Sequence, residues 1–206
     1  MKKHLLVIFL VFGTFFAPLS AYEILVEGKI GAYFPKGDTI KDVFSNTIGN
    51  YQAEISWTPF RRSVCLEDWW KNLYAFGSVS YITSRGETIT EDDTDFEIIP
   101  VSLGIKYIQP LPWCFEVYGS IAPRYFFLDI HNENEGVKST DRARGLGGVY
   151  SIGALFRPCR CLFVDLYVDY SHKRFDDDNF ESGNNIIAHT VELSGFTAGI
   201  GLGLAF

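Results

Sequence analysis

The last twelve residues of the chain, GFTAGIGLGLAF, alternate small residues with large apolar ones. A period of two is the pattern of a β-strand, because successive side chains of a strand point to opposite faces. The same period recurs in seven earlier segments: 22–35, 51–59, 73–83, 97–108, 114–127, 149–156 and 162–171. Each segment is about ten residues long, which is the length of a tilted transmembrane strand. The sequence therefore predicts eight strands.

The two faces of these strands differ in polarity. One face is built of Ile, Leu, Val, Phe and Tyr without a charge, and the opposite face carries eight charged residues: Glu27, Lys29, Glu54, Lys106, Glu116, Arg124, Asp165 and Asp169. A soluble eight-stranded barrel of the lipocalin type would bury the charged face in a dry core, where each carboxylate needs a partner. We therefore favour an inverted arrangement: an all-β, eight-stranded, antiparallel up-and-down transmembrane β-barrel, with the charges inside and the apolar face toward lipid.

The connections between the strands fall into two classes that alternate along the chain. The long polar ones cover 36–50, 85–95, 131–145 and 172–185, whereas the shorter ones cover 61–72, 109–113 and 158–160. Long loops at one end and short turns at the other are typical of outer-membrane barrels.

The first 21 residues have the features of an export signal. Lys2 and Lys3 precede an apolar run, and small Ala21 ends the segment. This order is typical of a secretory signal peptide, and an uncleaved membrane anchor is the alternative, although the run is short for a spanning helix. We expect a signal peptide over 1–21 and a barrel domain over 22–206 in the outer membrane. The formal net charge of −7 argues against nucleic acid as a partner.

At its final strand the chain resembles the small outer-membrane β-barrel family that includes OmpX and the transmembrane domain of OmpA. The last strand of that family alternates and stops on an aromatic residue, usually Phe. The resemblance implies that Phe206, Leu204 and Leu202 form a signal read by the barrel-assembly machinery. We further expect a monomer surrounded by outer-membrane lipid and lipopolysaccharide. The glycines between these residues should face the lumen and leave space for larger side chains such as Tyr118 and Arg124.

Three classes of function are compatible with such a barrel. The five acidic and three basic inward residues indicate a paired network that plugs the lumen; a narrow channel for small or hydrophobic solutes is the alternative. An enzyme that edits lipid A is least favoured, because the family members that do so place a His and a Ser two residues apart, whereas Ser171 and His172 are adjacent. We expect no enzymatic activity and no cofactor. The acidic runs in 92–95 and 176–178 are typical of solvated outward loops. Divalent cations could bridge them to lipopolysaccharide phosphates, but neither run has the spacing of a calcium-binding loop. We expect a structural or surface-interaction role of the adhesion type, with an unknown surface ligand.

Four cysteines lie in or beside the shorter turns: Cys65, Cys114, Cys159 and Cys161. An exported chain enters an oxidising compartment, where an even number of cysteines suggests disulfides. Cys114–Cys159 is the first choice because both residues flank one predicted hairpin, which leaves Cys65 and Cys161. A Cys159–Cys161 bond is less favoured because its small ring is strained, and free thiols are the remaining alternative. A zinc site lacks the usual ligand spacing.

Overall fold

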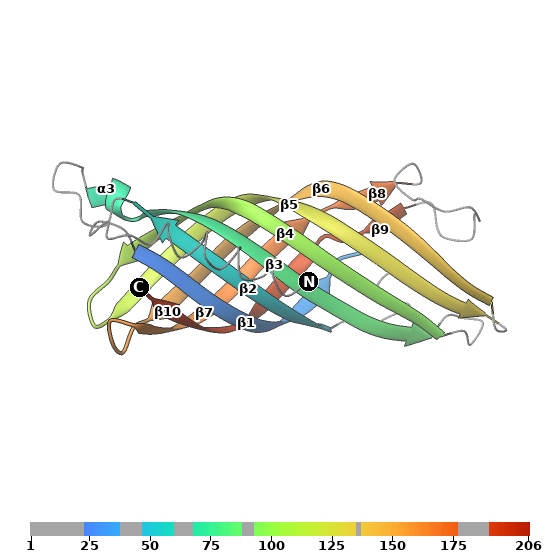
Figure 1. The fold of residues 1–206 in the computed structure, drawn as a ribbon, viewed down its shortest axis with the longest axis horizontal. Coiled ribbons are helices and arrows are strands. Elements are labelled where there is room, and N and C mark those ends of the chain that lie inside the picture. Colours follow the sequence, from blue (N-terminus) through green and yellow to red (C-terminus); the bar gives the residue numbers. More distant parts are fainter. Residues whose placement is uncertain (1–22, 38–46, 60–67, 88–92, 135–136, 177–189) are drawn as a thin grey trace, which may run out of the picture.

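Eight antiparallel strands close into a barrel in the computed structural model, which describes residues 23–37, 47–59, 68–87, 93–134, 137–176 and 190–206. In chain order they are β1 (Glu23–Pro35), β2 (Ile48–Thr58), β3 (Leu73–Glu87), β4 (Asp93–Pro110), β5 (Phe115–Asn134), β6 (Val137–Phe156), β7 (Leu162–His172) and β10 (Gly195–Ala205). Each strand pairs with its neighbour in this order, and β10 pairs with β1 to close the sheet (Figure 1). The predicted fold class is confirmed. The expected signal peptide over 1–21 lies outside the described residues.

The barrel closes through the strand whose alternation is most regular. The pairing of β1 with β10 runs without interruption from Leu25↔Ala205 to Pro35↔Gly195. One step further, the backbone groups of Ile24 and Phe206 exchange two hydrogen bonds of 3.1 and 2.9 Å. A closed sheet leaves no row of unpaired N–H and C=O groups, which a lipid surrounding would not satisfy.

Four neighbouring strands extend well beyond their predicted ends. β3 has 15 residues, β4 has 18 and β5 and β6 have 20 each, so they continue into segments that we expected to be loops, 85–95 and 131–145. The pairing of β5 with β6 extends to Asn134↔Val137. Outside a lipid layer both faces of a hairpin meet water, so backbone pairing alone can continue the strands. The sequence analysis relied on apolar alternation, which such segments do not need.

Three small elements were not predicted. β8 (Arg174–Asp176) pairs with β9 (Thr190–Glu192), and the short helix α3 (Asp68–Lys71) precedes β3. In Figure 1 α3 and the C-terminus lie at one end of the barrel, here called the turn end, and β8 and β9 lie at the other, here called the loop end. Within the described ranges, no helix has the length and apolar character needed to cross a membrane.

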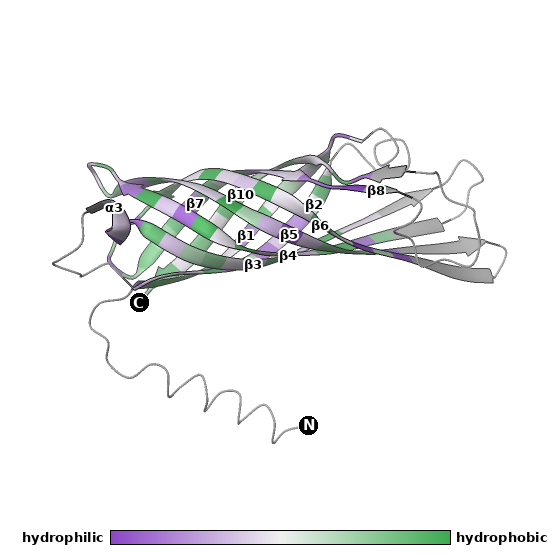
Figure 2. Ribbon diagram, turned by 90° about the horizontal axis from the view of Figure 1, so that it is seen from above, coloured by the Kyte–Doolittle hydropathy of each residue, from purple (hydrophilic) through white to green (hydrophobic). Residues whose placement is uncertain are grey.

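The barrel has an apolar exterior and a charged interior. Along β2 every second residue from Ile48 to Thr58 is buried and the residues between them are exposed. Large apolar side chains such as Leu103, Ile152 and Leu202 are 71, 66 and 60% exposed. Figure 2 shows apolar residues recurring along the wall of the barrel. An apolar belt of this extent is unstable in water and is the surface that a lipid layer covers.

Candidate functional site

The structure places all eight predicted inward charges inside the barrel, where each is buried. Five of them, here called the five-charge cluster, meet at one level: Glu27, Lys29, Glu54, Lys106 and Asp165. The Nζ atom of Lys29 lies 3.1 Å from Glu27, 3.2 Å from Glu54 and 3.0 Å from Asp165. The Nζ atom of Lys106 bridges Glu27, at 3.3 Å, and Glu54. Two ammonium groups are thus shared by three carboxylates.

Strand register explains why these charges need one another. Glu27 of β1 lies directly opposite Glu54 of β2, a like-charge pair that is unfavourable by itself. Lys106 reaches both carboxylates from β4 and Lys29 reaches them from β1. The attraction of the two ammonium groups for the carboxylates offsets the repulsion between Glu27 and Glu54. On the other side of β1, Gly201 separates Lys29 from Asp165 in the register of the sheet. A Cβ atom at Gly201 would lie 3.1 Å from Cγ of Lys29 and 3.2 Å from Cβ of Asp165. The glycine therefore lets the two side chains meet above it.

Arg124 forms a second polar group inside the barrel. Its Nε donates to Ser102 Oγ and its Nη1 to Ser171 Oγ, both at 2.8 Å. Its Nη2 lies 3.9 Å from Asp169, which makes a looser ion pair. Neutral hydroxyls thus supply the short contacts of this guanidinium, and the carboxylate supplies the opposite charge.

Glu116, the eighth predicted residue, belongs to a separate ion cluster at the turn end. Its carboxylate lies 2.7 Å from Nε of Arg157, whose Nη1 lies 2.7 Å from Glu23. Tyr74 donates a hydrogen bond of 2.5 Å to the same Glu23, and the guanidinium of Arg157 lies over the ring of Phe163. Burial lowers the pKa of Arg157, but the hydrogen bond to Glu23 and the charge of Glu116 outweigh it, so the net shift is upward. These residues join β1, β3, β5 and the β6–β7 turn across the mouth of the barrel.

Two large apolar clusters lie along the lumen, one toward each end, and a third, smaller one consists of Phe76, Ala122 and Val149. The loop-end cluster consists of Tyr33, Ile48, Ile82, Phe96, Ile98, Phe126, Leu128, Ala143, Phe175 and Leu193. Phe175 of β8 and Leu193, next to β9, bring the segment between β7 and β10 into this cluster, and Tyr33 donates a 2.8 Å hydrogen bond to the carbonyl of Leu193. The turn-end cluster consists of Leu25, Tyr74, Ile108, Tyr118, Leu155, Phe163 and Tyr167. Side chains therefore fill the lumen on both sides of its charges.

Glycines make room for the largest rings in the lumen. A Cβ atom at Gly203 would lie 2.2 Å from the ring of Phe163, and one at Gly153 would lie 2.6 Å from the ring of Tyr118. The sequence analysis expected the glycines of the last strand to face Tyr118 and Arg124. Instead Tyr118 lies over β6, and the last strand accommodates Phe163 and the Lys29–Asp165 pair. Alternation predicts which face a glycine occupies, but the ring that covers it depends on the register between strands.

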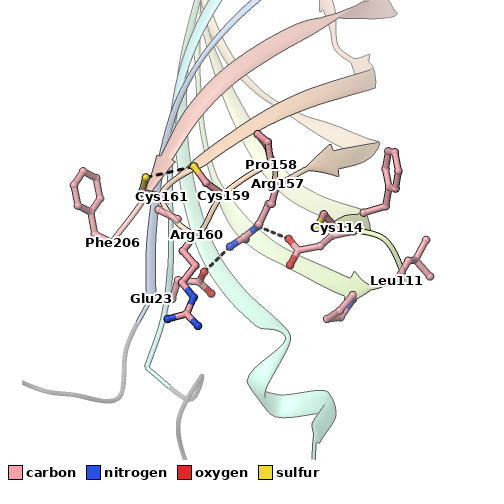
Figure 3. Close-up of a pocket in the computed structure, with 13 residues that line it drawn as sticks. Glu23, Leu111, Cys114, Arg157, Pro158, Cys159, Arg160, Cys161 and Phe206 are labelled. Atoms are coloured by element: carbon pink, nitrogen blue, oxygen red, sulfur yellow. Dashed lines mark hydrogen bonds and ion pairs between the residues drawn. The ribbon is translucent and has the colours of Figure 1, made fainter.

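A pocket of about 750 Å³ opens at the turn end, and three exposed cysteines line it: Cys114, Cys159 and Cys161 (Figure 3). All three are free thiols, and the expected Cys114–Cys159 bond is not formed between them. The Sγ atom of Cys159 instead lies 3.5 Å from that of Cys161. Cys65 lies outside the described residues, so its pairing remains a prediction. In the part of the chain that the structure describes, no three His, Cys, Asp or Glu side chains are placed to hold a metal ion.

The adjacent Ser171 and His172 point in different directions, as their spacing predicts. Ser171 is buried and accepts the hydrogen bond from Arg124, whereas His172 is exposed. Nδ1 of His172 lies 2.9 Å from Oγ of Ser194, a contact across the β7–β10 connection that spacing along the chain could not reveal. Ser194 is fully buried, so a substrate carbonyl has no access to its hydroxyl. This pair therefore does not have the arrangement of a catalytic nucleophile and its base.

Comparisons with known proteins place this geometry in a known fold. No family model and no curated protein sequence matches the chain. Among solved structures, Ail, the attachment invasion locus protein of Yersinia pestis, superposes with a TM-score of 0.57 at 13% identity, over 90% of this chain and 99% of Ail. The outer membrane protein OprG from Pseudomonas aeruginosa gives 0.59 at 9% identity, over 90% and 96%. A major outer membrane protein from Thermus thermophilus gives 0.58 at 17% identity, over 90% and 100%.

The chain has the fold of the small eight-stranded outer-membrane β-barrels. The predicted resemblance is confirmed at this level, and the neighbours agree with the predicted outer-membrane location. At identities this low, the structural similarity shows a shared fold only. The function has to be inferred from the features of this barrel itself.

Sequence reasoning missed part of what fills this barrel. Glu23 and Arg157 were not singled out, although both are essential to the turn-end ion cluster. Glu23 shares the parity of Glu27 and Lys29 along β1, and that signal could have identified it. Arg157 follows the last residue of β6, where alternation has ended, so no periodic signal marks it.

Proposed function

We propose that this protein is a monomeric structural barrel of the outer membrane that presents an interaction surface outside the cell and does not act as a channel. The observation that carries the proposal is the filled lumen. The five-charge cluster and the Arg124 group lie between two apolar clusters, and the turn-end ion cluster crosses one mouth. A solute would have to displace rings at both ends and separate buried ion pairs, which costs several kcal/mol for each uncompensated charge. This arrangement supports a plug more than a pore.

The orientation follows from the asymmetry of the connections. In outer-membrane barrels the short turns face the periplasm and the long loops face outward. We therefore infer that the turn end faces the periplasm and that the long ends of β4, β5 and β6 extend from the outer surface. A paired sheet that extends beyond the lipid is a rigid platform on which a partner can bind, and rigid platforms lower the entropic cost of binding.

The charge of the loop-end segments indicates which class of partner can bind there. The segment 85–95 carries one basic and five acidic residues, and 173–192 carries two basic and five acidic residues. The fold neighbour Ail has also been solved with a heparin analogue, sucrose octasulfate. We infer a different partner here, because an acidic surface repels a sulfated polyanion. A cationic protein surface fits this charge, as do lipopolysaccharide phosphates bridged by divalent cations.

Two measurements test the proposal. Purified barrel inserted in a planar bilayer should show no steady conductance for small ions, and stable single-channel steps would contradict the closed lumen.

The second measurement concerns binding. The same barrel in lipid discs should bind a polylysine surface and should not bind a heparin surface. The triple variant Asp92→Asn, Asp93→Asn, Asp95→Asn should lose most of the polylysine binding, whereas Val168→Ala on the lipid-facing wall serves as the matched control. Preferential heparin binding would overturn the charge argument.

A further inference from the structure

The turn between β6 and β7 holds two thiols in contact. Cys159 and Cys161 flank Arg160, both side chains are exposed, and their Sγ atoms lie 3.5 Å apart. Figure 3 shows the pair at one side of the turn-end pocket, with Cys114 on the other side of Arg157. Residues two apart in an extended chain point to the same side but lie too far apart for their side chains to touch. The chain is bent over 158–161, and this bend brings the two sulfurs to van der Waals distance.

We propose that Cys159 and Cys161 form a redox-active site that exchanges disulfides with cysteines of a partner protein at the periplasmic rim of the barrel. The proposal goes beyond the proposed function and relies on it for one point, the exposure of the turn end to an oxidising compartment.

The geometry suits a reversible bond better than a structural one. A disulfide needs its sulfurs about 2.05 Å apart, so a small rotation of the two side chains closes the ring from the present 3.5 Å. A ring with a single residue between its cysteines is strained, and strained, exposed disulfides are the ones that are reduced easily. The pocket of about 750 Å³ beside the pair leaves space for a partner's cysteine-bearing segment.

The two thiols are chemically unequal. The backbone N–H of Cys161 hydrogen-bonds the sulfur of Cys159 and lowers the pKa of that thiol, with a further contribution from the backbone N–H of Leu162. The side-chain hydrogen bond with Cys159, and the negative charge that Cys159 acquires, raise the pKa of Cys161. Cys159 is therefore the more acidic thiol of the reduced pair and the better leaving group of the oxidised pair.

The exchange balances without any further reagent. In the oxidised barrel, a thiolate of the partner attacks Sγ of Cys161; the Cys159–Cys161 bond breaks, and Cys159 leaves as a thiolate. The partner's second thiolate then attacks the partner sulfur of this mixed disulfide, and Cys161 leaves and takes up a proton. Two electrons pass from the partner dithiol to the barrel, so the partner gains a disulfide and the barrel pair becomes a dithiol. A small-molecule disulfide such as oxidised glutathione restores the barrel pair. The Cys159 thiolate attacks one glutathione sulfur and releases one glutathione thiolate; Cys161 then loses its proton and attacks Sγ of Cys159, which releases the second glutathione thiolate.

The test is a redox titration of the whole folded barrel in detergent. The protein is equilibrated with mixtures of reduced and oxidised glutathione, quenched with acid, alkylated and mapped by mass spectrometry. We expect a Cys159–Cys161 bond that forms and breaks reversibly across the series. In the reduced protein at neutral pH, Cys159 should react with iodoacetamide about ten-fold faster than Cys114 in the same pocket.

Variants assign the roles of the two sulfurs. Cys161→Ser should keep the fast thiol and accumulate a mixed disulfide between Cys159 and glutathione, because the second thiol that would resolve it is missing. Cys159→Ser should lose the fast reaction, and Cys114→Ser is the matched control that should leave the Cys159–Cys161 couple unchanged. A Cys114–Cys159 bond in the oxidised protein would overturn the proposal. So would equal alkylation rates, or zinc bound by the pair with no ring at any glutathione ratio.

Failure here is distinguishable from failure of the proposed function. Conductance and polylysine binding do not depend on these thiols, so Cys159→Ser should leave both unchanged. A barrel that conducts ions but still cycles its Cys159–Cys161 bond would overturn only the proposed function.

Discussion

The positive charge of Lys106 is needed to neutralise buried carboxylates in the lumen. Together with Lys29 it balances three carboxylates, Glu27, Glu54 and Asp165, so the five-charge cluster already has one carboxylate more than it has cations. We expect Lys106→Met to lower the free energy of unfolding by about 3–5 kcal/mol, because it leaves buried carboxylates without their counter-charge. Glu27→Gln removes a charge of the sign in excess and should change stability by about 1 kcal/mol or less. Urea unfolding in lipid vesicles, followed by heat-modifiable gel migration, measures both. Equal losses would contradict this charge balance.

Neighbouring residues on opposite faces of β7 test the inverted polarity. Val168 is 41% exposed on the outer wall, whereas Asp169 is buried inside next to Arg124. We expect Val168→Arg to cost about 2–4 kcal/mol, because the charge would lie among lipid tails near the middle of the wall. Asp169→Asn should cost less, since Arg124 retains its hydrogen bonds to Ser102 and Ser171. The same unfolding assay ranks the two variants, and the reverse order would mean that the faces are assigned wrongly.

At the scale of the element, two glycines on paired strands form a matched test of the alternation. Gly203 of β10 faces inward, where a Cβ atom would lie 2.2 Å from the ring of Phe163; Gly28 of β1 faces outward, where a Cβ atom would meet nothing within 4 Å. We expect Gly203→Ala to destabilise the barrel by about 1–3 kcal/mol through overpacking. Gly28→Ala should be neutral or stabilising, by up to about 1 kcal/mol, because Ala orders the strand at a smaller entropic cost than Gly. Unfolding measurements that show the two changes to be equivalent would contradict the packing against Phe163.

Among the residues that the structure describes, the non-glycine residues with positive φ lie in the β4–β5 turn. Trp113 and Cys114 have φ values of 69° and 65°, in the left-handed region that side chains with a Cβ atom disfavour. Glycine populates this region readily, so Cys114→Gly should raise the free energy of unfolding by about 1 kcal/mol. Cys114→Ala keeps the Cβ atom and should give no such gain, which makes it the control for loss of the thiol. Thermal unfolding of the two variants side by side measures the difference.

Elements with a physical reason to alternate could be predicted, and the others could not. β2 and β7 lie between lipid and lumen along their whole length, and their burial alternates in the way that their sequences indicate. The far ends of β4, β5 and β6 are held by backbone pairing, which leaves no apolar period in the sequence. β8 and β9 have three residues each, too few for any period to be recognised.

At the scale of the whole molecule, alternation along each strand predicts which charged side chains face the lumen. It does not predict how those charged side chains group into separate clusters. The eight residues on the inward face separate into the five-charge cluster, the Arg124 group and Glu116 with its partner Arg157. This division depends on which residues share a level around the barrel, and that depends on the stagger between strands. The stagger results from cooperative closure of all eight strands, so no single segment contains it. The contact between Cys159 and Cys161 likewise depends on the bend of a turn that has no periodicity.

Phe206 has two conceivable roles: it could stabilise the folded barrel, or it could be recognised during assembly. Its place at the closing strand pair allows the two to be tested separately. Its backbone is bonded to Ile24, but its side chain is 70% exposed and buries little area in the folded barrel. Phe206→Ala keeps the two backbone hydrogen bonds, which deletion of the residue would remove, so we expect it to change the free energy of unfolding by less than about 1 kcal/mol. If Phe206, with Leu204 and Leu202, is the signal read by the assembly machinery, the same substitution should lower the folded barrel in the outer membrane several-fold. Phe34→Ala, on the outer face of the neighbouring strand, is the matched control and should leave that level nearly unchanged. Membrane fractionation with heat-modifiable migration quantifies the folded protein, and equal losses in both variants would show that Phe206 acts only as one more lipid contact.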